Sequence, residues 1–336
     1  MWVLFHCQAE AVWQWHNYFE ANTPPGKKLL RMNLDETALC LHQNDKKGNI
    51  FLCKGHDAMQ KVSLAVRRCY ITHVALVCDD PVVQASLPQI VICNERTLTV
   101  AMHAELQERL GDNFVLLRGR SAWVNGDLSV QILGLIAKAL EAFLDTHQPL
   151  LMLDAFRAHI VPKVFFAGAR YRLWLLVVPA GMTWLLQVLD THIFRAYKTC
   201  LRNAYQLHCI RRGWDAHSLT LLLDSVRDAT AAVINGEDWS SAFARNGFGQ
   251  SQSEVRPRIW KFLKLNAATK ISMTRPTESQ VRVCFPRKAK VTYKAIWRTL
   301  DAPAVVVPKA ACRKVPILPK AAGSIASRTR SKAKAK

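Results

Sequence analysis

Short apolar runs of strand length alternate with longer amphipathic stretches between residues 28 and 207, and this order limits the fold to the α/β class. Strands are predicted at Leu29–His42, Ile50–Cys53, Tyr70–Cys78, Gln89–Cys93, Pro149–Asp154 and Arg172–Val178. A polar turn at residues 44–48 joins the first two as a hairpin. Helix-spaced apolar residues predict one helix over Asp127–Leu144, capped by Asn125 or Asp127, and a longer one over Thr183–Leu207. Together they predict a mixed sheet covered by helices.

The most apolar stretch of the chain, Leu173–Leu189, covers 17 positions without a charged residue. It is slightly short for a membrane span, and Pro179 and Gly181 interrupt its middle. We therefore expect a buried strand, a turn and the start of a helix there, and no membrane partner.

Positive charge is concentrated near the C-terminus. The chain has 46 Lys and Arg against 25 Asp and Glu, a net charge of +21. Residues 255–336 hold 21 of the basic residues and only two acids, Glu278 and Asp301, so the rest of the chain is close to neutral. This distribution predicts a polyanionic partner for the C-terminal quarter.

These patterns divide the chain into five segments. We predict an N-terminal helix and linker over residues 1–27, the α/β domain over 28–212, a helical extension over 213–254, a basic region over 255–301 and a basic tail over 302–336. The tail has nine basic residues without an acid and no periodic apolar face, so we expect it to be disordered.

Basic side chains in the last two segments are candidates for nucleic-acid binding, because Lys and Arg neutralise phosphates largely independently of sequence. They are Arg256, Arg258, Lys261, Lys264, Arg287, Lys288, Lys290, Arg328, Arg330 and Lys332. The alternative for each of these side chains is an ordinary position on the solvated surface, without a nucleic-acid ligand. The end of the tail, Arg328–Lys336, fits a nuclear-import signal as well as a DNA contact.

The cysteines do not indicate a metal site or a secreted protein. Ten are scattered through the chain without a C-x-x-C pair or a His cluster at zinc-ligand spacing, which argues against structural zinc. The start, Met1–Phe5, lacks the basic leader of a secretory signal. We therefore expect reduced, intracellular thiols.

Three aspartates, Asp35, Asp154 and Asp190, lie within or at the ends of predicted apolar elements. A carboxylate is costly in such surroundings unless a metal ion or a charged partner compensates it. Taken singly, each also has an ordinary interpretation: a solvent-facing strand end for Asp35, a helix cap for Asp154 and a helix-surface acid for Asp190.

The blocks around these three acids resemble those of the pogo and Tigger group of DDE-superfamily transposases, which includes jerky-like proteins. The blocks are Asn33–Thr37 (NLDET), Leu150–His159 (LLMLDAFRAH) and Val178–Lys198 (VPAGMTWLLQVLDTHIFRAYK). In the third, Gln187, Leu189 and Asp190 resemble the family's Gln-Pro-Leu-Asp turn that leads into a helix. Secondary matches are Ser121–Asn125 (SAWVN) and Ser241–Gly247 (SAFARNG).

The resemblance implies an RNase H-like fold over residues 28–212, with a mixed five-stranded sheet flanked by helices. Asp35 would lie on the first strand, Asp154 at the end of the fourth and Asp190 on a later helix. It also implies that these three acids are catalytic and bind two Mg²⁺ or Mn²⁺ ions, which suit oxygen ligands. The chain would then be a nuclear endonuclease and strand-transfer core acting on DNA. A homodimer is an assembly that stays open for it.

Some residues depart from the family's pattern. Val188 stands where the family usually has Pro, and Ala155 follows Asp154 where Asn or Gly is common. Helix-turn-helix DNA-binding domains normally precede this core, whereas only residues 1–34 precede Asp35 here. We therefore do not expect a full transposition cycle by this chain alone, and an alternative stays open: a catalytically silent, domesticated nuclear protein that binds DNA or chromatin.

Two histidines and one glutamate lie close to the acids in sequence. A functional role for His159 or His192 would be a contact to phosphate or water, but we expect both on helix surfaces. Glu36 neighbours Asp35 on a predicted strand, where adjacent side chains face opposite ways, so we do not expect it to share the metals.

Overall fold

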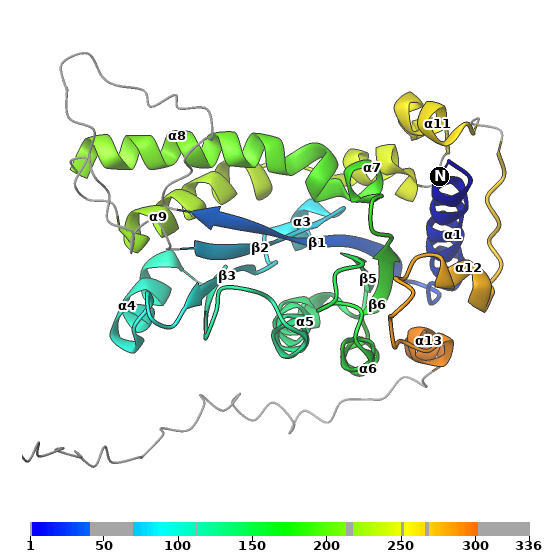
Figure 1. The fold of residues 1–336 in the computed structure, drawn as a ribbon, viewed down its shortest axis with the longest axis horizontal. Helices are drawn as coiled ribbons and strands as arrows, with labels where there is room; N and C mark the ends of the chain where they lie inside the picture. The colour runs from blue at the N-terminus through cyan, green and yellow to red at the C-terminus, as the bar shows by residue number, and fades with distance from the viewer. Residues whose placement is uncertain are drawn as a thin grey trace, which may run out of the picture. The chain divides into compact units, whose positions relative to one another are not determined.

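The fold is built on six strands that form one mixed sheet with helices on both faces (Figure 1). The computed structural model describes residues 2–40, 70–111, 113–212, 218–249, 252–265 and 269–301. The strands are β1 (Lys28–Cys40), β2 (Tyr70–Cys78), β3 (Gln89–Asn94), β4 (Phe114–Gly119), β5 (His147–Asp154) and β6 (Trp174–Val178). They lie side by side in the order β4-β3-β2-β1-β5-β6.

Strand direction divides the sheet at β1. On one side β2 runs antiparallel to both β1 and β3, with β4 parallel to β3, and on the other side β5 and β6 continue parallel to β1. Every residue of β6 and the six central residues of β5 are buried, because helices cover both faces of these strands. This explains why both strands have continuous apolar sequences rather than alternating ones.

The α/β class and the mixed sheet are confirmed, but the strand count is six rather than five. The additional strand, β4, was not predicted, and neither was the helix α4 that precedes it. Strand β2 has the predicted bounds, whereas the predicted strand Ile50–Cys53 and the hairpin turn before it lie outside the described residues. Within the described residues, β1 pairs with β2 on one side, with Asp35 opposite Ala75, and with β5 on the other.

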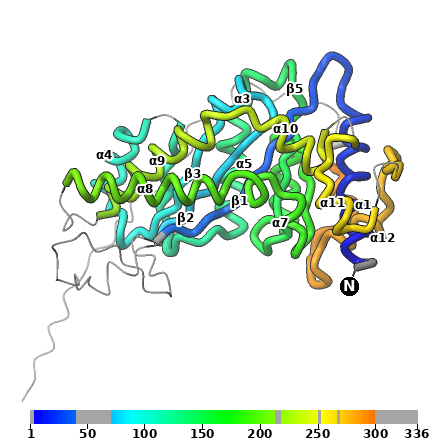
Figure 2. Tube along the Cα trace, turned by 90° about the horizontal axis from the view of Figure 1, so that it is seen from above, coloured from blue at the N-terminus to red at the C-terminus, as the bar shows by residue number. Residues whose placement is uncertain are grey.

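The helices of the described residues lie on the two faces of the sheet and beside it. They are α1 (Trp2–Ala21), α3 (Pro81–Gln84), α4 (Val100–Leu110), α5 (Gly126–Leu140), η1 (Glu141–Phe143), α6 (Pro162–Arg170), α7 (Thr183–Leu186), η2 (Leu189–Ile193), α8 (Phe194–Arg212), α9 (Leu219–Ala229), η3 (Thr230–Ile234), α10 (Ser240–Phe243), η4 (Ala244–Phe248), η5 (Gln252–Glu254), α11 (Pro257–Leu263), α12 (Glu278–Arg282) and α13 (Tyr293–Asp301). Helices α8 and α9 lie on one face, and α5 and α6 on the other. Seen from above in Figure 2, α8 runs beside α9 over the strands.

The long helix predicted over Thr183–Leu207 is divided into three pieces. Helix α7 ends at Leu186, Gln187 has extended backbone angles (φ −81°, ψ 126°), and the π-helical turn η2 then leads into α8. The break occurs because the buried side chain of Gln187 donates a hydrogen bond to the carbonyl of Leu34 on β1 (3.2 Å). A contact across the fold therefore overrides local helix propensity at this position.

The basic region 255–301 is folded where it is described, and it completes the hydrophobic core beside α1. Trp297 on α13 is fully buried, and its indole lies 5.6 Å from that of Trp15 and 5.7 Å from the ring of Phe19 between ring centroids. Helix α13 also packs against α6, and α11 and α12 pack against α1. The apolar residues of this region are therefore part of the same core as the sheet.

Arg31 ties α1 to the sheet through a buried network. Its Nη1 forms an ion pair with Asp79 (2.9 Å), its Nη2 with Glu20 on α1 (2.6 Å), and its Nε donates to Nε2 of His16 (2.9 Å). Burial raises the pKa of Asp79, and the charge of Arg31 opposes that rise. The guanidinium is therefore the group that keeps this buried carboxylate compensated.

Two buried histidines predict a loss of stability in acid. Burial, and then the charge of Arg31, lower the pKa of His16 to about 3, and burial lowers that of His73 to about 4. An unfolded histidine titrates near pH 6.5, so between pH 6.5 and 4 the unfolded chain binds protons that the folded chain excludes. The stabilisation is complete above pH 6.5 and is lost as the pH falls.

The measurement is urea unfolding of wild type and His73→Gln at several pH values between 7 and 4. Each such histidine contributes a slope of up to about 1.4 kcal/mol per pH unit to the free energy of unfolding. We expect the variant to lose less stability in acid than wild type. Parallel curves for the two proteins would contradict this account of His73.

None of the helices in the described ranges is both long and apolar enough to cross a membrane. Leu173–Leu189 instead forms β6, a turn with Gly181 at φ +81°, and α7, as its sequence predicts. The tail from residue 302 lies outside the described residues, so its disorder stays a prediction.

Candidate metal centre

Asp35 and Asp154 are carried by neighbouring parallel strands. The paired register of β1 and β5 ends with Asn33 opposite Met152. Continuing this register by two residues brings Asp35 opposite Asp154, the last residue of β5. Because equivalent positions of parallel strands present their side chains to the same face, the sheet places these two carboxylates next to each other.

Asp190 is brought to the same place by hydrogen bonds from β1. The backbone N–H of Leu189 donates to Oδ1 of Asn33 (2.9 Å), and Nδ2 of Asn33 donates to the carbonyl of Met152 on β5 (3.3 Å). Asn33 is fully buried and lies two residues before Asp35, on the same face of β1. The residue that precedes Asp190 is therefore fixed against the strand face that carries Asp35.

The carboxylates act on one another electrostatically. Burial, followed by the charges of Asp190, Glu36 and Asp154, raises the pKa of Asp35 to about 8, although the N–H of Glu36 donates to its Oδ1 (2.8 Å). Like charges raise a pKa in this way only when they are close. The three predicted aspartates and Glu36 thus form one group, which we call the acidic cluster, and Asp35 carries a proton at neutral pH.

His159 joins two members of the acidic cluster. Its Nδ1 lies 2.7 Å from Oδ1 of Asp154 and its Nε2 lies 2.8 Å from Oε1 of Glu36. Its side chain is 3% exposed. Burial lowers the pKa of His159, but the two carboxylates outweigh burial and raise it to about 10, so the ring is an imidazolium that bridges them.

The expectation of a helix-surface position for His159 is wrong, whereas the expectation that Glu36 does not share the metals stays a prediction. The chain turns back directly after β5, where the N–H of Phe156 donates to Asp154 (3.1 Å) and the N–H of His159 donates to the carbonyl of Phe156 (2.9 Å). This turn inserts the His159 ring between Asp154 and β1 instead of leaving it on a helix surface. Glu36 does face away from Asp35, but the ring of His159 reaches it on that side.

The second histidine, His192, lies in η2 and is about half-buried. Its Nδ1 lies 2.8 Å from Oγ1 of Thr191. Burial, and then the charges of Arg256 and Arg245, lower its pKa to about 4, so it is neutral at physiological pH. His192 therefore lies on a helical element, as expected, but is partly buried.

One subset of the acidic cluster has the spacing of metal ligands. Glu36, Asp154 and His159 each offer one ligand atom, and these atoms lie within 4.8 Å of one another. Both nitrogens of His159 already contact carboxylates, so a cation bound at this subset would replace a proton on the ring. Of the three predicted aspartates only Asp154 belongs to this subset, whereas Asp35 and Asp190 are linked to it electrostatically. Carboxylate oxygens such as theirs are the ligands that a hard cation such as Mg²⁺ or Mn²⁺ prefers.

Charge balance also favours a cation. Four acids, Asp35, Glu36, Asp154 and Asp190, face one imidazolium, and protonation of Asp35 relieves part of their repulsion. A divalent cation can replace that proton and relieve the repulsion more fully. The donor set therefore fits the ions that the resemblance implies.

The predicted basic residues fall into three groups. Arg256 and Arg258 lie beside α7. Nη2 of Arg256 donates to the carbonyl of Leu185 (3.0 Å), and the guanidinium of Arg258 lies over the ring of Trp184 (5.2 Å to the ring centroid). Exposed side chains elsewhere in the basic region are Lys261, Lys264, Arg287, Lys288 and Lys290. Arg328, Arg330 and Lys332 lie outside the described residues.

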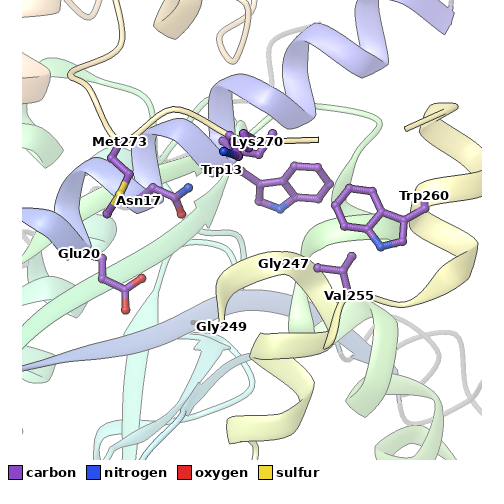
Figure 3. A pocket seen from close by; sticks show the side chains of 10 residues that line it. Trp13, Asn17, Glu20, Gly247, Gly249, Val255, Trp260, Lys270 and Met273 are labelled. Atoms are coloured by element: carbon purple, nitrogen blue, oxygen red, sulfur yellow. The ribbon is translucent and has the colours of Figure 1, made fainter. Parts of the chain in front are cut away.

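A separate cavity of about 350 Å³ lies between α1 and the segment from η4 to α11 (Figure 3). Trp13 and Trp260 form its aromatic wall, with ring centroids 5.5 Å apart. Glu20, which also lines it, is already paired with Arg31. No member of the acidic cluster lines this cavity, so it is not the metal centre.

Comparisons with protein-family models, with curated proteins and with solved structures found no match for this chain.

Proposed function

We propose that this chain is a transposase-derived, divalent-metal-dependent DNA endonuclease and strand-transfer core of the pogo and Tigger group, with Asp35, Asp154 and Asp190 as its metal-binding carboxylates. One observation carries the proposal: β1, β5 and η2, which are far apart in sequence, bring these three acids into one electrostatically coupled group. Coupled carboxylates with a strongly shifted pKa are frequent at functional sites.

The sheet supports the same proposal. Strands β3, β2 and β1 form an antiparallel succession, β5 and β6 continue in parallel on the far side of β1, and the acids sit on the central strand and its parallel neighbour. This arrangement is consistent with an RNase H-like sheet to which β4 is added at the edge. Asp190 then follows on a helical element, as the resemblance implies.

The proposed chemistry is hydrolysis of a phosphodiester by water, followed by attack of the released 3′-hydroxyl on a phosphodiester of target DNA, whose own 3′-oxygen leaves as a hydroxyl when the new P–O bond forms. When bound, Mg²⁺ or Mn²⁺ supplies water activation and stabilisation of the leaving oxygen. Asp35, Asp154 and Asp190 would hold the ions. His159 acts as a positioning residue, because its hydrogen bonds fix the orientation of Asp154, and Asn33 positions η2 and thereby Asp190.

Location in the nucleus is part of the proposal. It is supported by the basic tail, whose last residues, Arg328–Lys336, fit a nuclear-import signal. The same basic residues would add non-specific affinity for DNA.

A second candidate is a catalytically silent nuclear protein that binds DNA or chromatin. The contacts of His159 favour it, because one imidazolium satisfies Asp154 and Glu36 without a metal ion. In this alternative the acidic cluster is a structural network, and the basic region is the functional part.

Nicking of supercoiled plasmid by the full chain separates the two candidates. We expect relaxed plasmid in Mg²⁺ or Mn²⁺ and none in EDTA. Absence of nicking with both ions, in protein shown to be folded by circular dichroism, would contradict the endonuclease and leave the silent DNA-binding protein.

Deleting residues 302–336 is expected to weaken DNA binding, because the deletion removes nine basic side chains. For duplex DNA, the slope of log affinity against log salt concentration falls by about 0.9 for every phosphate that the protein no longer neutralises. Fluorescence anisotropy with a labelled duplex over a range of salt concentrations measures the slope. An unchanged slope would count against the tail as a DNA contact.

A further inference from the structure

Three arginines from two segments of the chain lie together next to η2. The backbone N–H of Arg256 donates to the carbonyl of Arg245 in η4 (3.0 Å), so these two residues adjoin although ten intervening positions separate them in sequence. Nη2 of Arg256 donates to the carbonyl of Leu185 at the end of α7 (3.0 Å). Arg258 follows on α11. We call Arg245, Arg256 and Arg258 the arginine cluster.

Hydrogen bonds place the arginine cluster beside the acidic cluster. Asn246, the residue after Arg245, is fully buried, and its Nδ2 donates to Oγ1 of Thr191 (2.8 Å) and to the carbonyl of Leu186 (3.0 Å). Thr191 is the residue directly after Asp190. The backbone that carries Arg245 is therefore fastened to the turn that carries Asp190.

The arginine cluster has no acidic counterpart. Among the residues that the structure describes, no carboxylate lies within 4.0 Å of a nitrogen of Arg245, Arg256 or Arg258, whereas Arg31 and Arg109 both have carboxylate partners. Nε of Arg256 is also buried and has no hydrogen-bond partner. Clustered guanidinium groups without a neutralising acid are electrostatically unfavourable, and an anion would relieve this.

Packing orients one of these charges without neutralising it. The guanidinium of Arg258 lies over the ring of Trp184, 5.2 Å from its centroid, and Trp184 in turn packs edge-on against Phe262 at 4.8 Å. A cation–π contact of this kind holds the side chain in place and leaves its full positive charge available. Arg245 and Arg258 are both exposed, so a ligand can reach them.

We propose that the arginine cluster binds the phosphates of a DNA strand and aligns that strand with the acidic cluster. Planar guanidinium groups present paired N–H donors that match phosphate oxygens. A positive site that Asn246 fastens to the turn carrying Asp190 fits a polyanion whose scissile phosphate lies at the metal centre while neighbouring phosphates rest on arginine. The choice of DNA as the ligand rests on the proposed function.

The test is DNA binding in EDTA, so that it does not depend on metal or on cleavage. Arg245→Gln/Arg258→Gln changes two exposed side chains, and Arg202→Gln, combined with Arg195→Gln, removes the same charge from exposed positions of α8. Affinity for a labelled duplex is measured by anisotropy across a salt series for wild type and both variants.

We expect the cluster variant to lose roughly 10-fold in affinity at moderate salt and to lower the salt slope by between about 1 and 2, because up to two phosphate contacts are removed. The α8 variant should lose clearly less affinity for the duplex. Equal affinities and slopes for the two variants would overturn the proposal. Since no metal is present, a protein that fails to nick plasmid but shows this difference retains the arginine site and loses only the endonuclease assignment.

Discussion

Asp35→Asn is expected to reduce divalent-dependent plasmid nicking by roughly 1,000-fold or more, which corresponds to about 4 kcal/mol of transition-state stabilisation. Asp35 is the member of the acidic cluster on which the charges of the other three act. An amide keeps the shape of the side chain but cannot supply a negative oxygen to a cation. Nicking rates of wild type and variant in Mn²⁺ give the comparison.

The same variant is expected to be more stable than wild type when no metal is present. Burial, followed by the charges of Asp190, Glu36 and Asp154, raises the pKa of Asp35 from 3.8 to about 8, so the carboxyl costs the folded chain stability that grows as the pH rises between these values and is greatest at pH 8 and above. A neutral amide does not carry this cost. A higher melting temperature of Asp35→Asn in EDTA at pH 8.5 would show that lost activity does not reflect lost folding.

Asp127→Asn is the matched control, because Asp127 is an 89% exposed carboxylate whose partner is the surface residue Lys163. It should leave nicking and melting nearly unchanged. Nicking by Asp35→Asn at the wild-type rate would remove Asp35 from the catalytic set.

Arg31→Leu is expected to destabilise the folded chain by about 3 to 5 kcal/mol, because it leaves the buried carboxylate of Asp79 without its cation. The substitution also removes the partners of Glu20 and His16 on α1, and thus removes the polar link between that helix and the sheet. The free energy of unfolding in urea at pH 7 measures the effect.

An exposed ion pair provides the contrast for this substitution. Lys163→Leu breaks the pair with Asp127, whose side chains are 47% and 89% exposed, and is expected to cost no more than about 1 kcal/mol. Adding Asp79→Asn to Arg31→Leu should recover part of the lost stability. If Arg31→Leu and Lys163→Leu lower the free energy of unfolding by the same amount, the buried network does not hold α1 in place.

The sequence was most informative where local pattern and burial agree. Tyr70–Cys78 and Pro149–Asp154 are apolar runs of strand length, and both form strands at the predicted positions. Phe114–Gly119 is a run of the same kind at the edge of the sheet, yet it is short and ends in Arg118 and Gly119, so its pattern is weak. The mixed α/β sheet could therefore be predicted, but its sixth strand was missed.

The candidate site likewise contains residues that the sequence could indicate and residues that it could not. Asp35 and Asp154 could be singled out because each is an acid in or at the end of an apolar strand. His159 could not, since its partner Glu36 is 123 positions away and only the turn after β5 brings them together. The break at Gln187 likewise depends on a hydrogen bond to Leu34, a contact that helix periodicity does not record.

The aromatic residues contributed by α13 have a consequence for how the basic region can change. Trp297 fills the space between Trp15 and Phe19, so residues that follow the acidic cluster in sequence complete the hydrophobic interior that supports it. A shortened chain that ends at residue 254 would present these rings to water. The exposed charges of this region are thus carried by a segment that the hydrophobic interior requires. Its exposed side chains can be substituted without loss of the fold, whereas deletion of the segment would remove part of the core.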